Sequence, residues 1–234
     1  MIKRFMGFWS EERALSVFLL LLVVDMFVIG PAVRIGLALD FLSDLLFSIL
    51  LLAGVLTVVR HRTLQWTTGL FVLLAIAVRW AGMVFGAPGL LLWNGIFSLV
   101  SILAFLLIIL WWVYREGRVT GHRVRGAVAA YLLFAVCFSF AYDLTEYVHP
   151  GSFTLFLEGA QGSQTRPASF LYFSVVTLTT VGFGDIAAVH PVARSLVMVE
   201  ALVGTLYPAI LLARLVTLQM ETRRSKHRPS DGDA

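Results

Sequence analysis

The sequence predicts an all-α membrane protein with six transmembrane helices, and its composition and the lengths of its apolar segments support this class. Of the 234 residues, 59% are hydrophobic and only 14% are charged. A soluble domain is usually about 45–50% apolar and about 25% charged. This composition argues against a soluble enzyme, a disordered regulator and a nucleic-acid-binding module.

The apolar residues are gathered into blocks long enough to cross a bilayer, which takes about 20 residues in a helix. Six such blocks are found, at residues 14–33, 38–59, 64–85, 89–114, 124–142 and 192–218. The first has no small-residue cleavage pattern at its end, so we expect a retained span and not a signal peptide. Between the fifth and sixth blocks, the apolar stretch 168–179 is too short to cross and indicates a re-entrant helix.

Basic residues lie in alternate loops between these blocks, as cytoplasmic loops do in membrane proteins. They are Lys3, Arg4, Arg13; Arg60, Arg62; Arg115, Arg118, Arg123, Arg125; and Arg223, Arg224, Lys226, Arg228. This pattern predicts that both termini are cytoplasmic. It also explains the net charge of +4 without a nucleic-acid partner.

The most informative motif is Thr-Leu-Thr-Thr-Val-Gly-Phe-Gly-Asp at residues 177–185. It follows the short apolar stretch and precedes the last span. It resembles the selectivity filter of potassium channels, the TVGYG loop. The resemblance covers about residues 131–216. In the first four spans it is only topological, to six-helix members of the tetrameric cation-channel superfamily.

Backbone carbonyls can replace the water around a cation if a strand points successive carbonyls the same way. Such a strand needs backbone angles that glycine adopts easily, which accounts for Gly182 and Gly184. The resemblance implies that K+ is bound by the carbonyls of Thr180, Val181, Gly182 and Phe183, and by the Thr180 hydroxyl. Each chain supplies one loop, so the resemblance implies a homotetramer. The ion is the permeant species, and no organic cofactor is expected.

The apolar blocks, the positions of the basic residues and the resemblance together divide the chain into five parts. They are a cytoplasmic N-terminus (1–13), a four-helix peripheral domain (14–114), a cytoplasmic linker (115–123), a pore domain (124–218) and a disordered cytoplasmic tail (219–234). Within the pore domain it implies an outer helix (124–147), a pore helix (167–179), the filter (180–185) and an inner helix (191–218).

The filter region departs from the family pattern at three positions. Phe183 replaces the commoner tyrosine and lacks its hydroxyl, while Val176 stands where some channels carry a glutamate that pairs with the filter aspartate. Tyr172 stands where many members have a tryptophan. We expect filter support from Thr177, Tyr172 and Asp185, with a Tyr172–Asp185 hydrogen bond behind the filter.

The inner helix carries the candidate gating residues. Gly204 is either a hinge, as the resemblance implies, or a site of close helix packing. Pro208 removes a backbone hydrogen bond and should kink the helix. If Thr205 and Pro208 face the pore axis, helical spacing brings Leu212 and Val216 to the same face, where they would form an apolar constriction.

Glu200 is an unexpected carboxyl group inside a span, where a charge is costly unless neutralised, paired or wet. One interpretation is that it faces the cavity and concentrates cations. The other is that it is protonated and hydrogen-bonded to pore-helix hydroxyls such as Ser174 or Thr177.

The fourth span contains no Arg or Lys, so we expect little voltage dependence. The other ionisable groups in the spans, Asp25, Asp40, Asp44 and Arg79, are expected to pair with one another or, alternatively, to form a proton- or ligand-sensing site. His149 and His190 should flank the outer mouth, where they are either simply solvated or pH-sensing.

The sequence therefore favours a non-enzymatic, potassium-selective channel, with itself and membrane lipid as partners. A weakly selective cation channel and a subunit of a potassium uptake transporter are the alternatives. The expected location is a cell membrane, the bacterial inner membrane in particular.

Overall fold

The computed structural model describes residues 15–29, 40–58, 62–85, 88–115, 121–155 and 166–226, and they are mostly helical, as predicted. Residues 15–24 form a helix that continues as the π-helix η1 (Asp25–Ile29). The other helices are α3 (Asp40–Val58), α4 (Arg62–Phe85), α5 (Pro88–Tyr114), α6 (Gly121–Val148), α7 (Arg166–Leu178) and α8 (Pro191–Lys226). Two short strands, β1 (Phe153–Leu155) and β2 (Ile186–Ala188), flank α7 in the sequence.

Within the described residues, three of the six predicted spans are helices long and apolar enough to cross a membrane. They are Leu92–Tyr114, Arg123–Val148 and Pro191–Arg214, in α5, α6 and α8. In the helices before them, the described apolar segments are Leu15–Ile29, Phe41–Val55 and Trp66–Gly82. The predicted re-entrant helix is α7, and its apolar part, Ser169–Leu178, is short. A membrane protein is therefore supported, while the count of six spans is not.

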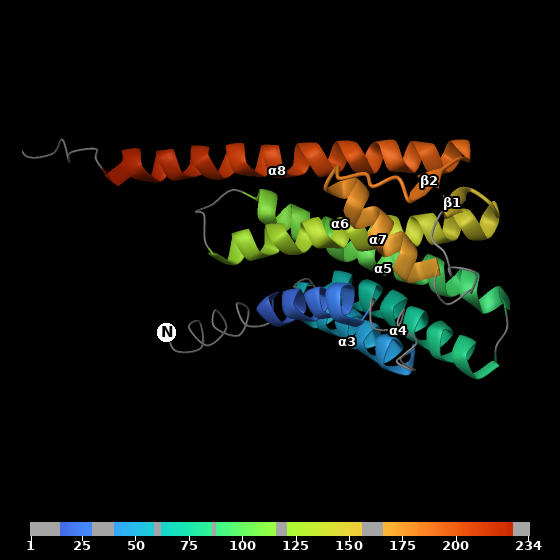
Figure 1. The fold of residues 1–234 in the computed structure, drawn as a ribbon. Coiled ribbons are helices and arrows are strands. Elements are labelled where there is room, and N and C mark those ends of the chain that lie inside the picture. The colour runs from blue at the N-terminus through green and yellow to red at the C-terminus, as the bar shows by residue number, and fades with distance from the viewer. Residues whose placement is uncertain are drawn as a thin grey trace, which may run out of the picture.

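The helices pack in a sequence of layers, from α3 and α4 through α5 and α6 to α7 and α8 (Figure 1). One apolar core runs across the first layers, where the Phe18 and Phe105 rings meet edge to face with centroids 6.4 Å apart. α7 is inclined between α6 and α8 and contacts both (Figure 1). The short helix and the loop after it are thus supported by the two longest helices of the chain.

The segments before α7 and after the filter motif are joined by an antiparallel pair of strands. The register pairs Phe153 with Ala188 and Leu155 with Ile186. The Glu146 carboxylate, at the end of α6, accepts hydrogen bonds from the backbone N–H groups of Gly151 (2.9 Å) and Phe153 (3.2 Å). These bonds fix the turn between α6 and β1.

A second core cluster lies beneath this sheet and is mainly aromatic. Its rings come from α6, β1 and α7, with centroid distances of 4.9–6.4 Å: Tyr142, Phe153, Phe170 and Phe173. The cluster holds the first half of α7 against α6, and so sets the direction in which α7 points.

The last helix corrects one prediction. We expect disorder from residue 219, but α8 continues to Lys226. The segment after Leu218 is polar, yet it contains Gln, Met, Glu, Arg and Lys, which have good helix propensity. Low hydropathy therefore marks the end of the apolar stretch and not the end of the helix.

Candidate functional site

The loop after α7 has an unusual backbone. The φ angles of Thr180, Gly182 and Gly184 are +60°, +57° and +79°. Val181 and Phe183, between them, do not have positive φ. A positive φ is open to glycine but strained for a β-branched residue such as Thr180. In an ordinary β-strand, successive carbonyl groups point to opposite sides. When the φ angles alternate in sign, successive carbonyl groups can point to the same side.

The loop is anchored to the end of α7 through its N–H groups. The carbonyl of Val176 accepts hydrogen bonds from the N–H groups of Val181 (3.0 Å) and Gly182 (3.4 Å), and the carbonyl of Thr177 accepts one from Thr180 (2.9 Å). In this described segment, no backbone N–H bonds to the carbonyls from Thr180 to Phe183. The N–H groups of Thr180, Val181 and Gly182 thus bond to α7, and the carbonyl oxygens of the loop are left for another ligand.

The side chains around the loop lie as follows. Val181 and Phe183 are 54% and 69% exposed in the single chain. The Asp185 carboxylate accepts a hydrogen bond from the N–H of Ile186 at 3.1 Å. Tyr172 is partly buried against the aromatic cluster. Its predicted hydrogen bond to Asp185 stays a prediction.

Gly204 of α8 lies directly against the last carbonyl of α7. A Cβ atom at this position would stand 2.7 Å from the carbonyl carbon of Leu178 and closer still to its oxygen. The same carbonyl accepts a hydrogen bond from the Tyr131 hydroxyl at 3.1 Å. Of the two interpretations of Gly204, the structure therefore supports close packing, and a hinge remains a prediction.

Glu200 is fully buried, one turn before Gly204. The hydroxyl of Ser174, one of the two pore-helix hydroxyls considered from the sequence, bonds to one carboxyl oxygen. The Tyr142 hydroxyl bonds to the other. Tyr142 had no signal in the sequence, because the contact joins residues far apart in the chain. The cavity-facing interpretation of Glu200 does not agree with this burial.

The remaining inner-helix candidates are exposed in the single chain. The Thr205 hydroxyl bonds back to the carbonyls of Ala201 (3.1 Å) and Leu202 (3.0 Å). α8 continues as one helix through Pro208, and Leu212 and Val216 are 65% and 48% exposed. Their role as a constriction stays a prediction.

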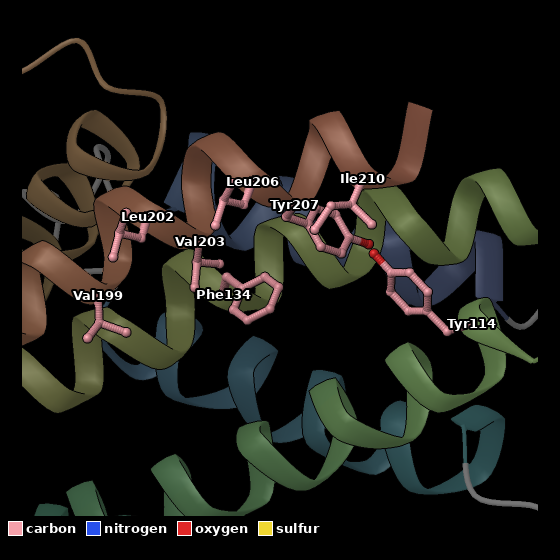
Figure 2. Close-up of a pocket in the computed structure, with 8 residues that line it drawn as sticks. All are labelled: Tyr114, Phe134, Val199, Leu202, Val203, Leu206, Tyr207 and Ile210. Carbon is pink, nitrogen blue, oxygen red and sulfur yellow. The ribbon is translucent and has the colours of Figure 1, made fainter. Parts of the chain in front are cut away.

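An apolar groove of about 290 Å³ lies along α8 where it faces α6 and the end of α5 (Figure 2). It is lined by Tyr114, Phe134, Val199, Leu202, Val203, Leu206, Tyr207 and Ile210. On its α8 side, four of these side chains are more than half exposed: Val199, Leu202, Leu206 and Ile210. This face of α8 is therefore unpartnered in the single chain.

Outside the loop, two predicted groups of ionisable residues can be placed. Asp44 and Arg79 form an ion pair, with 2.6 Å between Asp44 Oδ1 and Arg79 Nη2, which confirms pairing for these two. The Asp40 side chain lies outside the described residues. The imidazole rings of His149, just after α6, and His190, just before α8, stack with centroids 4.5 Å apart.

Two comparisons with known proteins match the region that contains this loop. Residues 128–221 match the family model described as "Ion channel". The inward rectifier potassium channel Kirbac3.1 of Paramagnetospirillum magnetotacticum is 35% identical over 78 residues, which are 33% of this chain. The matched part spans 22% of that relative's length. No solved structure matches the chain.

The region that matches the family model contains α7, the loop after it and most of α6 and α8. The comparisons therefore show that this region of the chain is similar to an ion-channel domain and to part of a potassium channel.

Proposed function

We propose that the protein is a potassium-selective channel, in which four copies surround one central pore. The observation that carries this proposal is the loop at residues 180–184. Its φ angles alternate in sign, and its N–H groups are turned back onto α7. Four such loops around an axis would surround a dehydrated K+ with the carbonyl oxygens of Thr180, Val181, Gly182 and Phe183.

The exposed apolar side chains favour an assembly of four copies over a single chain. A loop of this kind is tolerated at membrane depth only where protein or a wet cavity covers it. In the single chain Val181 and Phe183 are exposed, and so is the apolar face of α8. In the proposed tetramer neighbouring copies cover the filter side chains and part of this face, and lipid covers the rest. The exposed Leu212 and Val216 then narrow the cytoplasmic end.

In this assembly residues 124–218 form the pore domain, and residues 14–114 form a peripheral domain joined to it by the linker 115–123. Both termini are cytoplasmic, in a bacterial inner membrane. α5 is the fourth span of that arrangement and contains no Arg or Lys. Each charge that crosses the field contributes only about 2.3 kcal/mol per 100 mV, so an uncharged helix gives no steep voltage dependence.

The test is the reversal potential of the purified protein in a planar bilayer, with K+ on one side and Na+ on the other. We expect reversal near the potassium equilibrium potential and a conductance that changes little with voltage. Reversal near zero would replace this proposal with a weakly selective cation channel. A mass in detergent below four chains, together with no flux, would contradict the tetrameric pore.

A further inference from the structure

The buried Glu200 carboxyl group joins three helices. It belongs to α8, while Tyr142 belongs to α6 and Ser174 to α7. The Ser174 hydroxyl also lies 2.8 Å from the carbonyl oxygen of Ala135, again on α6. The four groups form one chain of oxygens: Tyr142 hydroxyl, Glu200 carboxyl, Ser174 hydroxyl and Ala135 carbonyl.

The number of hydrogens available to these four oxygens decides whether Glu200 is ionised or neutral. It has three oxygen–oxygen contacts, and a hydroxyl has one hydrogen to donate. If Glu200 were ionised, only the Tyr142 and Ser174 hydroxyls would carry hydrogens. Ser174 could then donate to Glu200 or to Ala135, and one contact would be left without a proton.

A neutral acid supplies the missing hydrogen. Tyr142 then donates to Oε2 of Glu200, the acid O–H at Oε1 donates to Ser174, and Ser174 donates to the Ala135 carbonyl. Every contact has one donor and one acceptor, and no charge is buried. Among the described residues, no Lys, Arg or His forms an ion pair with Glu200 that would favour the charged form.

We propose that Glu200 is a neutral acid and a positioning residue that fastens the pore helix α7 to the outer and inner helices. Ser174 lies six residues before Thr180, and Gly204 lies one turn after Glu200 against the end of α7. The network and the Gly204 contact therefore hold α7 at two points along its length. The consequence for the filter depends on the proposed channel function, whereas the neutral acid and the fastening do not.

The first test is the infrared spectrum of the purified protein at neutral pH, as the difference between wild type and Glu200→Gln. We expect the wild type to show a C=O stretching band of a protonated carboxyl group that the variant lacks. Loss of carboxylate bands instead would overturn the proposal. This measurement needs no conduction, so its failure is distinct from failure of the channel assay.

The second test compares two substitutions of Glu200. Gln has an N–H donor and a carbonyl acceptor and can replace a neutral acid in this chain, whereas Met can do neither. We expect Glu200→Met to lower the unfolding midpoint by about 5–10 °C, and Glu200→Gln to restore most of that loss. Equal losses in the two variants would overturn the proposal.

Two further variants test the partners. Ser174→Ala and Tyr142→Phe should each lower the midpoint and shift or weaken the acid band. The matched control is Ser139→Ala, since Ser139 is a buried α6 serine that bonds only within its own helix, at 2.8 Å to the Val136 carbonyl. An unchanged acid band in both partner variants would contradict the network.

Discussion

Gly204 of α8 and Leu178 of α7 approach so closely that a methyl group on Gly204 would overlap the Leu178 carbonyl. The carbonyl carbon lies 2.7 Å from the position of such a Cβ atom. The obstacle is backbone at a helix end, which cannot rotate away as a side chain can. Glycine is thus required at the point where α8 crosses the end of α7, the helix before the candidate filter loop.

Gly204→Ala should therefore destabilise the protein even though Ala favours a helix. Overpacking typically costs about 1–3 kcal/mol, more than the gain of about 1 kcal/mol in helix propensity. Thermal unfolding and the oligomer fraction in detergent measure the result. The control is Gly95→Ala in α5, where a Cβ meets nothing within 4 Å and stability should hold or rise. A fully stable Gly204→Ala would show that the two helices can move apart freely.

The filter loop allows a second comparison of glycines. Gly182 and Gly151 have φ angles of +57° and +83°, so an alanine at either position is strained by about 1–2 kcal/mol. Only Gly182 lies in the candidate ion path. Gly182→Ala and Gly151→Ala should thus lower stability by similar amounts, while only Gly182→Ala abolishes K+ flux in proteoliposomes. Equal flux in the two variants would argue against an ion path through the loop.

The Asp44–Arg79 pair is expected to stabilise the peripheral helices. The side chains are only 17% (Arg79) and 25% (Asp44) exposed, and the guanidinium also lies 4.7 Å from the centre of the Phe47 ring. Removing one partner leaves the other charge mostly buried and without compensation. Asp44→Asn and Arg79→Gln should each destabilise the protein, and the double variant should lose less than their sum. A double-mutant cycle should give a coupling of about 1–3 kcal/mol, and a coupling near zero would make the pair energetically neutral.

The helices and the loop could be predicted from sequence for clear physical reasons. α5, α6 and α8 are long apolar helices because a bilayer requires that length, and Gly182 and Gly184 mark a backbone with positive φ. Both signals are local in the chain. The first three spans were predicted with the same rule, and their crossing of the membrane stays a prediction.

The Asp44–Arg79 and Ser174–Glu200 contacts were among the alternatives drawn from the sequence, because ionisable groups in a span need partners, but the sequence did not indicate the Tyr142 contact. Tyr142 and Glu200 are 58 residues apart, and no spacing rule connects them. The role of Val176 was also missed. Its carbonyl holds two N–H groups of the loop, and any residue type could supply that carbonyl. The only sequence signal for a partner of Glu200 was the presence of a carboxyl group inside an apolar span.

Arg214 connects the inner helix to the peripheral helices near the predicted constriction. Its guanidinium donates hydrogen bonds to the carbonyls of Tyr114 and, at 3.3 Å, Arg115, and it lies 5.0 Å from the centre of the Tyr114 ring. Tyr114 ends α5 and Arg115 follows it, whereas Leu212 and Val216 of α8 are exposed in the single chain. If the proposed pore axis lies on the exposed face of α8, we expect this contact to hold α8 outward and to favour an open mouth at Leu212 and Val216.

Arg214→Gln should weaken this contact and lower the open probability. Losing one or two such hydrogen bonds corresponds to about 0.5–1.5 kcal/mol, or roughly a two- to tenfold shift toward the closed state. Single-channel recording at fixed voltage measures it. Arg194→Gln is the matched control, because Arg194 lies at the other end of α8 and bonds the Ala188 carbonyl at 3.2 Å. An unchanged open probability in Arg214→Gln would mean that the peripheral helices do not act on the pore through this contact, and an increase would mean that the contact holds the pore closed.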